Sequence, residues 1–339
     1  MNNLTQAATI GSSSSNGAPA RPTTTRTLRL GGLNWLIWRQ HRAGFWTLIA
    51  ATAATVAVLV LQRAEMMDHL TAHGWPDAAP GKWLEGVHPI RFQLVSYGLG
   101  FIPIVLGVFL GAPLLAGDLE SGTAKLVASQ SVTPRRWLAT KLGMTALVVV
   151  VCTTALSIAF GRWWGPVKQE PTVLGWSDGS AFDNTGPVPV ALALFTVMSG
   201  VAIGMLLRRT LISMVVTFAV AVAVQVIWHF ERLALGHVVT ITTHQGIGPG
   251  SPRPQLPEAA LEIDESLISN SGETHGWGTC AHEISGKVCI QKYDLVGWSV
   301  DYLPISQMRS MQWFGASVLF ALTAAVTAFI LIRGRKRIV

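Results

Sequence analysis

Residues 142–160 read LGMTALVVVVCTTALSIAF, an apolar run without an acidic or basic side chain. About 20 such residues, wound as an α-helix, cross the roughly 30 Å hydrocarbon core of a bilayer. Five other runs share this character: Phe45–Leu61, Leu94–Ala116, Val188–Leu207, Leu211–Phe230 and Met311–Ile332. Buried helices of a soluble protein would not repeat this pattern six times in one chain. The sequence therefore predicts an all-α integral membrane protein with six transmembrane helices.

The composition of the whole chain agrees with this assignment. Of the 339 residues, 50% are hydrophobic and 13% are charged, whereas soluble domains carry roughly 25% charged residues. The mean hydropathy is +0.42. This composition excludes a cytosolic enzyme, a disordered protein and a nucleic-acid-binding protein. A pI of about 9.7 would suit nucleic acid, but the basic residues are distributed as in a membrane protein.

Lys and Arg gather on one side of the predicted spans. The N-terminal segment, the loop after the second span, the Arg208-Arg209 turn and the C-terminal tail hold 15 basic and two acidic residues. The loops of the other side hold the remaining ten basic and 16 acidic residues. Because positively charged loops stay in the cytoplasm, both termini are predicted to be cytoplasmic, in a bacterial plasma membrane.

The spans divide the chain into four parts. These are a disordered cytoplasmic N-terminus (1–28), an interfacial helix with the first five spans (29–230), an extracellular loop (231–310), and the sixth span with a basic cytoplasmic tail (311–339). The first part is rich in Ser, Thr, Ala and Asn and too poor in apolar residues to order itself. The first apolar run begins too late for a cleaved secretory signal.

Residues 31–44 precede the first span and mix apolar residues with a basic end. Trp35 and Trp38 lie among leucines, and Arg39 and Arg42 follow them. This pattern favours a short helix lying in the inner headgroup layer. A plain helical extension of the first span is the alternative.

The loop 117–141 is long for a connection between helices, which usually takes two to eight residues. Its apolar residues allow a short helix after Gly122, and Thr133-Pro134 is a favourable start for a second. We therefore expect helix, turn and helix on the cytoplasmic face. Small residues also recur four apart, as Gly107 and Gly111 in the second span and Gly200 and Gly204 in the fourth. Such pairs let helix backbones approach closely.

The outer loop 231–310 is expected to form a cap on the outer ends of the spans, with a helix at 258–268. Cys280 and Cys289 are predicted to form a disulfide, since this side is oxidising. A metal site is the alternative, because imidazole and thiolate ligands suit zinc or copper. The candidate imidazoles are His237, His244, His275 and His282, but their spacing matches no standard motif.

Several kinds of chemistry are missing from the sequence. It contains no phosphate-binding GxxxxGK[ST] loop, no HExxH and no GxSxG. The spans carry no paired carboxylates, which disfavours an ion-coupled carrier. Polar span residues that could line a substrate pathway are Thr196, Ser199, Ser213, Thr217 and Gln225. The sequence does not decide which of them face inward.

Residues 112–141, APLLAGDLESGTAKLVASQSVTPRRWLATK, resemble the loop between the second and third spans of type 2 ABC exporter permeases. In that family an acidic residue, a spacer and Gly-Thr follow the span, as Glu120, Gly122 and Thr123 do here. A Ser/Thr-rich turn and an Arg-Trp-led helix come next. The ending, from Tyr302 to the basic tail, is similar to one bacterial branch of the family. The resemblance covers roughly residues 29–339.

The resemblance implies the membrane subunit of an ATP-driven exporter that forms a translocation pathway as a dimer. Two copies of a separate ATPase subunit would bind the cytoplasmic side and carry ATP and Mg, so that this chain needs no cofactor and is not an enzyme. A coupling helix in the first cytoplasmic loop would transmit the movement. That role would fall on Asp118, Glu120, Gly122, Thr123, Lys125, Arg135 and Arg136. The substrate would be a drug, antibiotic, lipid or amphipathic peptide.

Other functions stay open at this stage. The main alternative is a membrane sensor or immunity protein whose extracellular loop binds a ligand. A membrane enzyme with outer-face chemistry would need a convergent catalytic set, which the sequence does not contain. A neighbouring ATPase gene would distinguish the exporter from the sensor.

Overall fold

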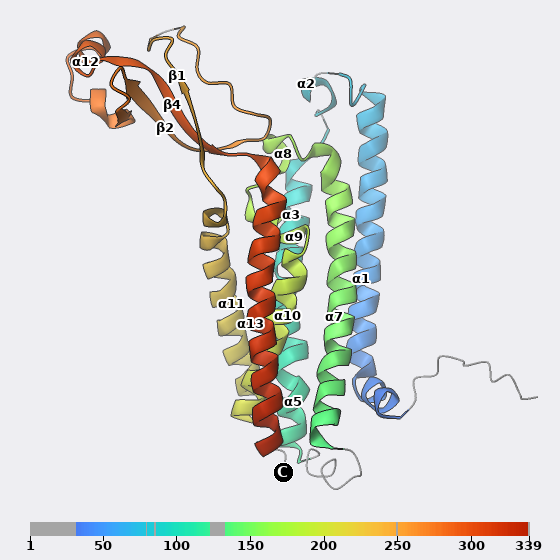
Figure 1. Ribbon diagram of the computed structural model, residues 1–339. Coiled ribbons are helices and arrows are strands. Elements are labelled where there is room, and N and C mark those ends of the chain that lie inside the picture. Colours follow the sequence, from blue (N-terminus) through green and yellow to red (C-terminus); the bar gives the residue numbers. More distant parts are fainter. Residues whose placement is uncertain (1–31, 79, 85, 123–132, 249, 338–339) are drawn as a thin grey trace, which may run out of the picture.

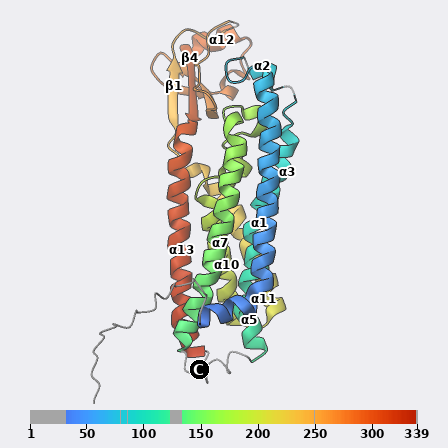
Figure 2. The ribbon, with the colours of Figure 1, turned by 90° about the vertical axis from the view of Figure 1, so that its right-hand side faces the viewer.

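The computed structural model describes residues 32–78, 80–84, 86–122, 133–248 and 250–337. Within these residues, six helical segments are long and apolar enough to cross a membrane, which confirms the six predicted spans. They stand side by side as one bundle, and a small β-sheet lies beyond one end (Figures 1 and 2). We call the end with the C-terminus the inner end, following the charge pattern, and the end with the sheet the outer end.

The spans follow the chain in order. The first is α1 (Leu33–Ala72), and the short helix α2 (Pro80–Trp83) follows it. The second consists of α3 (Pro89–Gly100), α4 (Ile102–Leu106), the π-helical turn η1 (Gly107–Gly111) and α5 (Ala112–Glu120). The third is α7 (Pro134–Trp164), and η2 (Gly165–Val167), α8 (Pro171–Leu174) and α9 (Gly179–Asn184) follow it. The last three are α10 (Val188–Leu207), α11 (Thr210–Glu231) and α13 (Met308–Arg337).

The first turns of α1 run across the inner end of the bundle, at a steep angle to the rest of the helix (Figures 1 and 2, darkest blue). The structure assigns residues 33–72 to one continuous helix that bends between these two directions. A separate interfacial helix at 31–44 therefore stays a prediction. These turns run across the bundle axis, as a helix lying in the plane of the headgroup layer would.

The second span packs against α10 at unusually close range. A Cβ atom added at Gly200 would lie 2.6 Å from the backbone oxygen of Gly107, and one added at Gly111 would lie 2.5 Å from that of Val197. Only glycine fits such a contact between two backbones. Pro103 and Pro113 lie on either side of η1, where the helical hydrogen-bond pattern is shifted.

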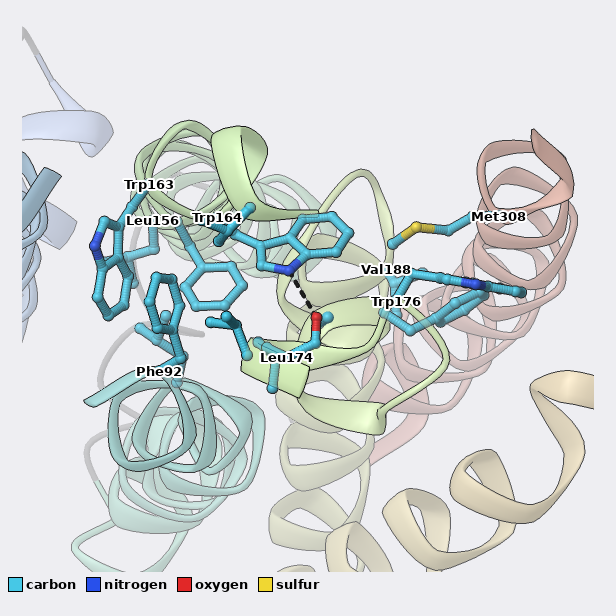
Figure 3. Packing of buried hydrophobic residues seen from close by; sticks show 14 of the residues in the cluster. Phe92, Leu156, Trp163, Trp164, Leu174, Trp176, Val188 and Met308 are labelled. Atoms are coloured by element: carbon cyan, nitrogen blue, oxygen red, sulfur yellow. Dashed lines mark hydrogen bonds between the residues drawn. The ribbon is translucent and has the colours of Figure 1, made fainter. Parts of the chain in front are cut away.

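Aromatic and aliphatic residues together form the core of the outer half of the bundle (Figure 3). The rings of Phe92 and Trp163 stack with 4.0 Å between their centres. Trp164 Nε1 donates a hydrogen bond to the Leu174 carbonyl oxygen at 3.0 Å. This core draws the segment between the third and fourth spans into the bundle. A second apolar cluster, at the inner end, includes Leu115, Trp137, Leu138, Met205 and Ile330.

The outer loop folds into an antiparallel sheet with the strand order β1-β4-β2-β3. The strands are β1 (Val239–Thr243), β2 (Leu261–Ser269), β3 (Thr274–Gly276) and β4 (Leu295–Leu303). Four short helical elements accompany them: η3 (Leu233–Leu235), η4 (Trp277–Cys280), α12 (Gly286–Lys292) and η5 (Ile305–Gln307). The all-α description therefore holds for the spans and not for this loop.

The prediction of a helix at 258–268 is wrong, because most of this stretch is strand β2. Leu261, Ile263 and Leu267 lie two and four positions apart in the sequence. Because side chains alternate between the two faces of a strand, this spacing also fits a strand. Strand β2 pairs with β4 along one edge and with β3 along the other. Pairing on both edges satisfies the backbone in the extended form and overrides the local helix pattern.

The sheet lies over the outer ends of α11 and α13, on the side of the bundle away from α1 (Figure 1). Gln307 fixes its base, because its side-chain oxygen accepts from the His237 N–H and its amide donates to the His237 oxygen, both at 2.8 Å. Trp176 Nε1 also donates to the Ala259 oxygen at 2.6 Å. The predicted cap thus covers one side of the outer end.

Candidate functional site

A buried ion pair lies at the inner end, between Asp118 of α5 and Lys141 of α7. Lys141 is completely buried, at 0% exposure. Gln40 Nε2, from α1, donates to the other carboxylate oxygen of Asp118 at 2.9 Å. An uncompensated buried charge is costly, so Asp118 and Lys141 are expected to stay together. With Gln40, they join α1, α5 and α7 at the inner end of the bundle.

Glu120, two residues further along, contacts a fourth helix. Its carboxylate accepts a hydrogen bond at 2.9 Å from the backbone N–H of Thr210, the first residue of α11. A carboxylate at this position satisfies a free N–H group and interacts favourably with the helix dipole. Glu120 thus joins the inner end of the second span to the start of α11.

The other residues predicted for coupling are less connected in the structure. Gly122 has a φ of 73°, a left-handed conformation that favours glycine. Arg135 and Arg136 are exposed in the first turn of α7. Thr123 and Lys125 lie outside the described residues, as does most of the loop expected to form the coupling helix.

A second polar site lies in the outer half, in a cavity of about 860 Å³ between the second span, the α8–α9 segment and α11. Its apolar lining includes Phe101, Ile104, Val222, Val226 and Phe230. Its polar lining includes Gln93, Asp178, Asp183, His229 and Arg232. The cavity thus combines a large apolar surface with charged groups of both signs.

Of the five polar residues that the sequence offered for a pathway, Gln225 is the one that lines this cavity. Its Nε2 donates to the Gly100 carbonyl oxygen at 2.9 Å. Thr196 is buried and donates to the Pro103 carbonyl oxygen at 2.7 Å, so it joins α10 to α4. The remaining three do not line this cavity: Ser213 and Thr217 are buried on α11, and Ser199 is half-buried on α10.

Asp183 and Arg232 form the charged wall of the cavity. Arg232 is 4% exposed, and its Nη1 lies 3.6 Å from Asp183 Oδ2 and 2.8 Å from His229 Nδ1. Trp228 Nε1 donates to Asp183 Oδ1 at 2.5 Å. The Arg232 guanidinium lies against Gly179, where a Cβ atom would collide with it.

Burial dominates the protonation of this pair. It raises the pKa of Asp183 to about 6, although the hydrogen bond from Trp228 and the charge of Arg232 both act in the opposite direction. Burial also lowers the pKa of the Arg232 guanidinium, against the opposing effect of Asp183 and Asp178. Asp183 is therefore a weaker acid in the folded protein than an exposed aspartate is.

The sequence pattern alone does not single out Gln40, Lys141, Asp183 or Arg232. One signal was available, because Asp118 ends an apolar run, Lys141 begins the next, and Arg232 follows the fifth. Single charges at span ends are common topological signals. Which of them pair depends on how the helices pack, and the sequence pattern does not contain that information.

Cys280 and Cys289 form a disulfide that joins η4 to α12 beside the sheet. Cys289 is fully buried against Leu267, Leu295 and Trp298. In the part of the chain that the structure describes, no three His, Cys, Asp or Glu side chains are grouped as a metal site. His275 lies against the ring of Tyr293, with 5.3 Å between the ring centres.

Comparison with known protein families finds a related family. The model of a protein family described as "ABC-2 membrane transporter related" matches residues 49–232. No curated protein and no solved structure matches the chain. The matched range begins within α1 and ends directly after α11, so it contains the outer cavity, Asp118, Glu120 and Lys141.

Proposed function

This chain belongs to the ABC-2 membrane transporter related family, and from that premise we propose that it is the permease subunit of an ATP-driven exporter. The family match over residues 49–232 carries the proposal, because it covers more than half of the chain and most of the bundle. The six apolar spans support a multi-pass permease. Export, the substrate, the dimer and the ATPase are parts of our proposal.

The ATPase acts from the cytoplasmic side as two copies of a separate subunit, which bind ATP and Mg. The absence of a phosphate-binding loop from this sequence supports that division of labour. The permease works as a homodimer in a bacterial plasma membrane, with both termini in the cytoplasm. A large exposed apolar surface on α11, including Leu211, Val215 and Phe218, supports a second chain or lipid at this face.

Coupling runs from the first cytoplasmic loop into the bundle through Asp118 and Glu120. The contacts of Asp118 with Gln40 and Lys141, and that of Glu120 with Thr210, support this route. Closure of the ATPase pair would move the loop and shift α1, α5, α7 and α11 together. Such shifts of packed helices can open a pathway alternately to the two sides.

The transported compound is amphiphilic, in the class of drugs, antibiotics, lipids or amphipathic peptides. The outer cavity supports this class, because its apolar lining faces a polar wall that carries Asp178, Asp183 and Arg232. A volume of about 860 Å³ is in the range of small-molecule sites.

Reconstitution tests the proposal. The purified chain should hydrolyse no ATP, whereas co-expression with the ATPase encoded beside it should give a complex with two copies of each chain. That complex in proteoliposomes should move a fluorescent amphiphile in an ATP-dependent manner. Robust ATPase activity of the chain alone would contradict the proposal. The absence of any ATPase complex would favour a sensor or immunity protein.

Two pairs of variants separate coupling from substrate binding. Glu120→Ala should reduce substrate-stimulated ATP hydrolysis, whereas Glu231→Ala, at the end of α11 opposite to the Thr210 contact of Glu120, should not. Val222→Trp should fill the cavity and lower the apparent affinity for the amphiphile, whereas Val151→Trp, at an exposed position of α7 away from the cavity, is its control. Equal effects within either pair would refute the role assigned to that site.

A further inference from the structure

A second large groove lies on another side of the bundle, between α7, α10 and α13 in the outer half. Its volume is about 760 Å³. Its apolar lining includes Ile158, Val190, Met308, Trp313 and Phe320. Ile158 and Trp313 are 54% and 53% exposed, so the groove opens to the outside of the bundle.

The outer end of this groove is positively charged. Lys168 follows η2, and Arg309 lies in the first turn of α13; both line the groove and both are exposed. Among the described residues neither forms an ion pair, and the groove lining contains no carboxylate. In this respect it differs from the cavity beside α11, where Asp178 and Asp183 accompany Arg232.

The back wall of the groove is held in place by hydrogen bonds. Gln312 Nε2 donates to the Phe182 carbonyl oxygen at 2.8 Å and to Thr185 Oγ1 at 2.9 Å. Gly161 contributes no side chain, and a Cβ atom there would meet only Thr185 Cγ2, at 3.8 Å. These hydrogen bonds hold the Gln312 side chain against the α9 segment. The groove is therefore left accessible to a molecule from the lipid side.

We propose that this groove binds an anionic phospholipid, with one acyl chain between α7 and α13 and the phosphate between Lys168 and Arg309. The apolar walls lie within the membrane-spanning length of the helices, and the two cations lie at its outer end, where headgroups are found. The basic side chains can extend toward the headgroup layer and bind the phosphate, while the apolar surface beside them holds the acyl chain. A second copy docked symmetrically on this face would bring four cations together without a compensating acid.

Native mass spectrometry of the full chain in detergent tests the headgroup. The probes are phosphatidylglycerol and phosphatidylcholine with identical acyl chains. Phosphatidylglycerol should bind about tenfold more tightly, and the double variant Lys168→Gln/Arg309→Gln should lose most of that preference. The control Lys82→Gln/Lys287→Gln removes two exposed outer cations that do not line the groove and should keep the preference.

A second pair of variants tests the acyl chain. Gly161→Leu would fill the groove while leaving both cations, and it should reduce phosphatidylglycerol binding several-fold. Gly98→Leu, at an exposed position of α3 with open space around it, is the control and should bind normally. Melting temperatures would show that both variants are folded.

Four outcomes would overturn the proposal. They are equal binding of the two lipids, equal losses in the two charge variants, undiminished binding in Gly161→Leu, and displacement of the lipid by millimolar inorganic phosphate. The last would identify an ion site without an acyl-chain component. Because the test uses the chain alone, its outcome does not depend on the ATPase or on transport.

Discussion

Lys141 carries its charge at a position without contact with solvent, and Asp118 is the carboxylate that offsets it. Removal of one partner of such a pair leaves a buried charge uncompensated, which typically costs about 3–5 kcal/mol. Asp118→Ala should therefore destabilise the fold strongly. Gln40→Ala removes a single hydrogen bond to the same carboxylate and should cost about 1 kcal/mol.

Unfolding in mixed micelles, followed by helical circular dichroism, would measure both changes. The double variant Asp118→Leu/Lys141→Met replaces the pair by apolar side chains and should recover much of the stability lost in Asp118→Ala. If Asp118→Ala costs no more than Gln40→Ala, then the Lys141 charge is compensated by water or by another group.

Asp183 links stability to pH, because its pKa is raised to about 6 in the folded protein. Between its ordinary pKa of about 4 and this value, the folded state binds more protons than the unfolded state. The free energy of unfolding should therefore fall as pH rises from 4 to about 6, by up to roughly 3 kcal/mol, and then level off.

Asp183→Asn tests this assignment, because asparagine cannot ionise but keeps an oxygen that can accept from Trp228. The stability difference between the variant and the wild type should increase from pH 4.5 to pH 7.5, in favour of the variant. Melting temperatures at both pH values suffice for the comparison. Parallel pH profiles of the two proteins would show that another group is responsible.

At the scale of elements, the contact between η1 and α10 depends on glycine. A Cβ atom at Gly200 would lie 2.6 Å from the Gly107 carbonyl oxygen, so a larger residue must push the two helices apart. Gly200→Leu should lower stability by about 1–3 kcal/mol or prevent folding. Gly143→Leu is the matched control, since its position on α7 is exposed and has no atom within 4 Å.

Thermal shift in detergent, with the yield of monodisperse protein, would measure both glycine variants. Equal melting temperatures would mean that the second span and α10 can separate without cost. In that case the recurrence of small residues at four-residue spacing would have no structural role in this chain.

The elements differ in how well the sequence predicts them. The six spans follow directly from apolar runs, because lipid leaves helices as the main way to satisfy the backbone. The outer loop lies in water, which can hydrogen-bond to exposed backbone groups, so helices are not required there. The pattern of Leu261, Ile263 and Leu267 fits a strand as well as a helix. Strand β4, more than 30 residues further along the chain, decides between them. The local sequence pattern does not predict such pairing between distant segments.

The same limit applies to the candidate sites. Asp118 and Glu120 could be selected from their place beside a span, but their partners Lys141 and Thr210 belong to other helices. Among the proposed pathway residues, polarity alone did not separate Gln225, which lines the cavity, from Thr196, which joins two helices. Burial and helix packing make that distinction.

At the scale of the whole molecule, the charge distribution predicts the orientation in the membrane. The side with 15 basic and two acidic residues should face the cytoplasm, and the sheet with its disulfide should face outward. Single cysteines introduced at Ser15 and at Ser251 should then react with a membrane-impermeant maleimide from opposite sides. In intact cells Ser251→Cys should be labelled at once, and Ser15→Cys only after the membrane is opened.

The native cysteines set the conditions of this experiment. Cys152 is buried in α7, and Cys152→Ala removes it as a background signal. Cys280 and Cys289 are joined and should not react unless they are reduced, so labelling must be done without reductant. Labelling of both introduced cysteines from the same side would require an even number of spans between them. In the structure, five spans separate residues 15 and 251, which places the two residues on opposite sides of the membrane. Same-side labelling would therefore contradict the six-span arrangement. It would mean that one of these helices does not cross the bilayer.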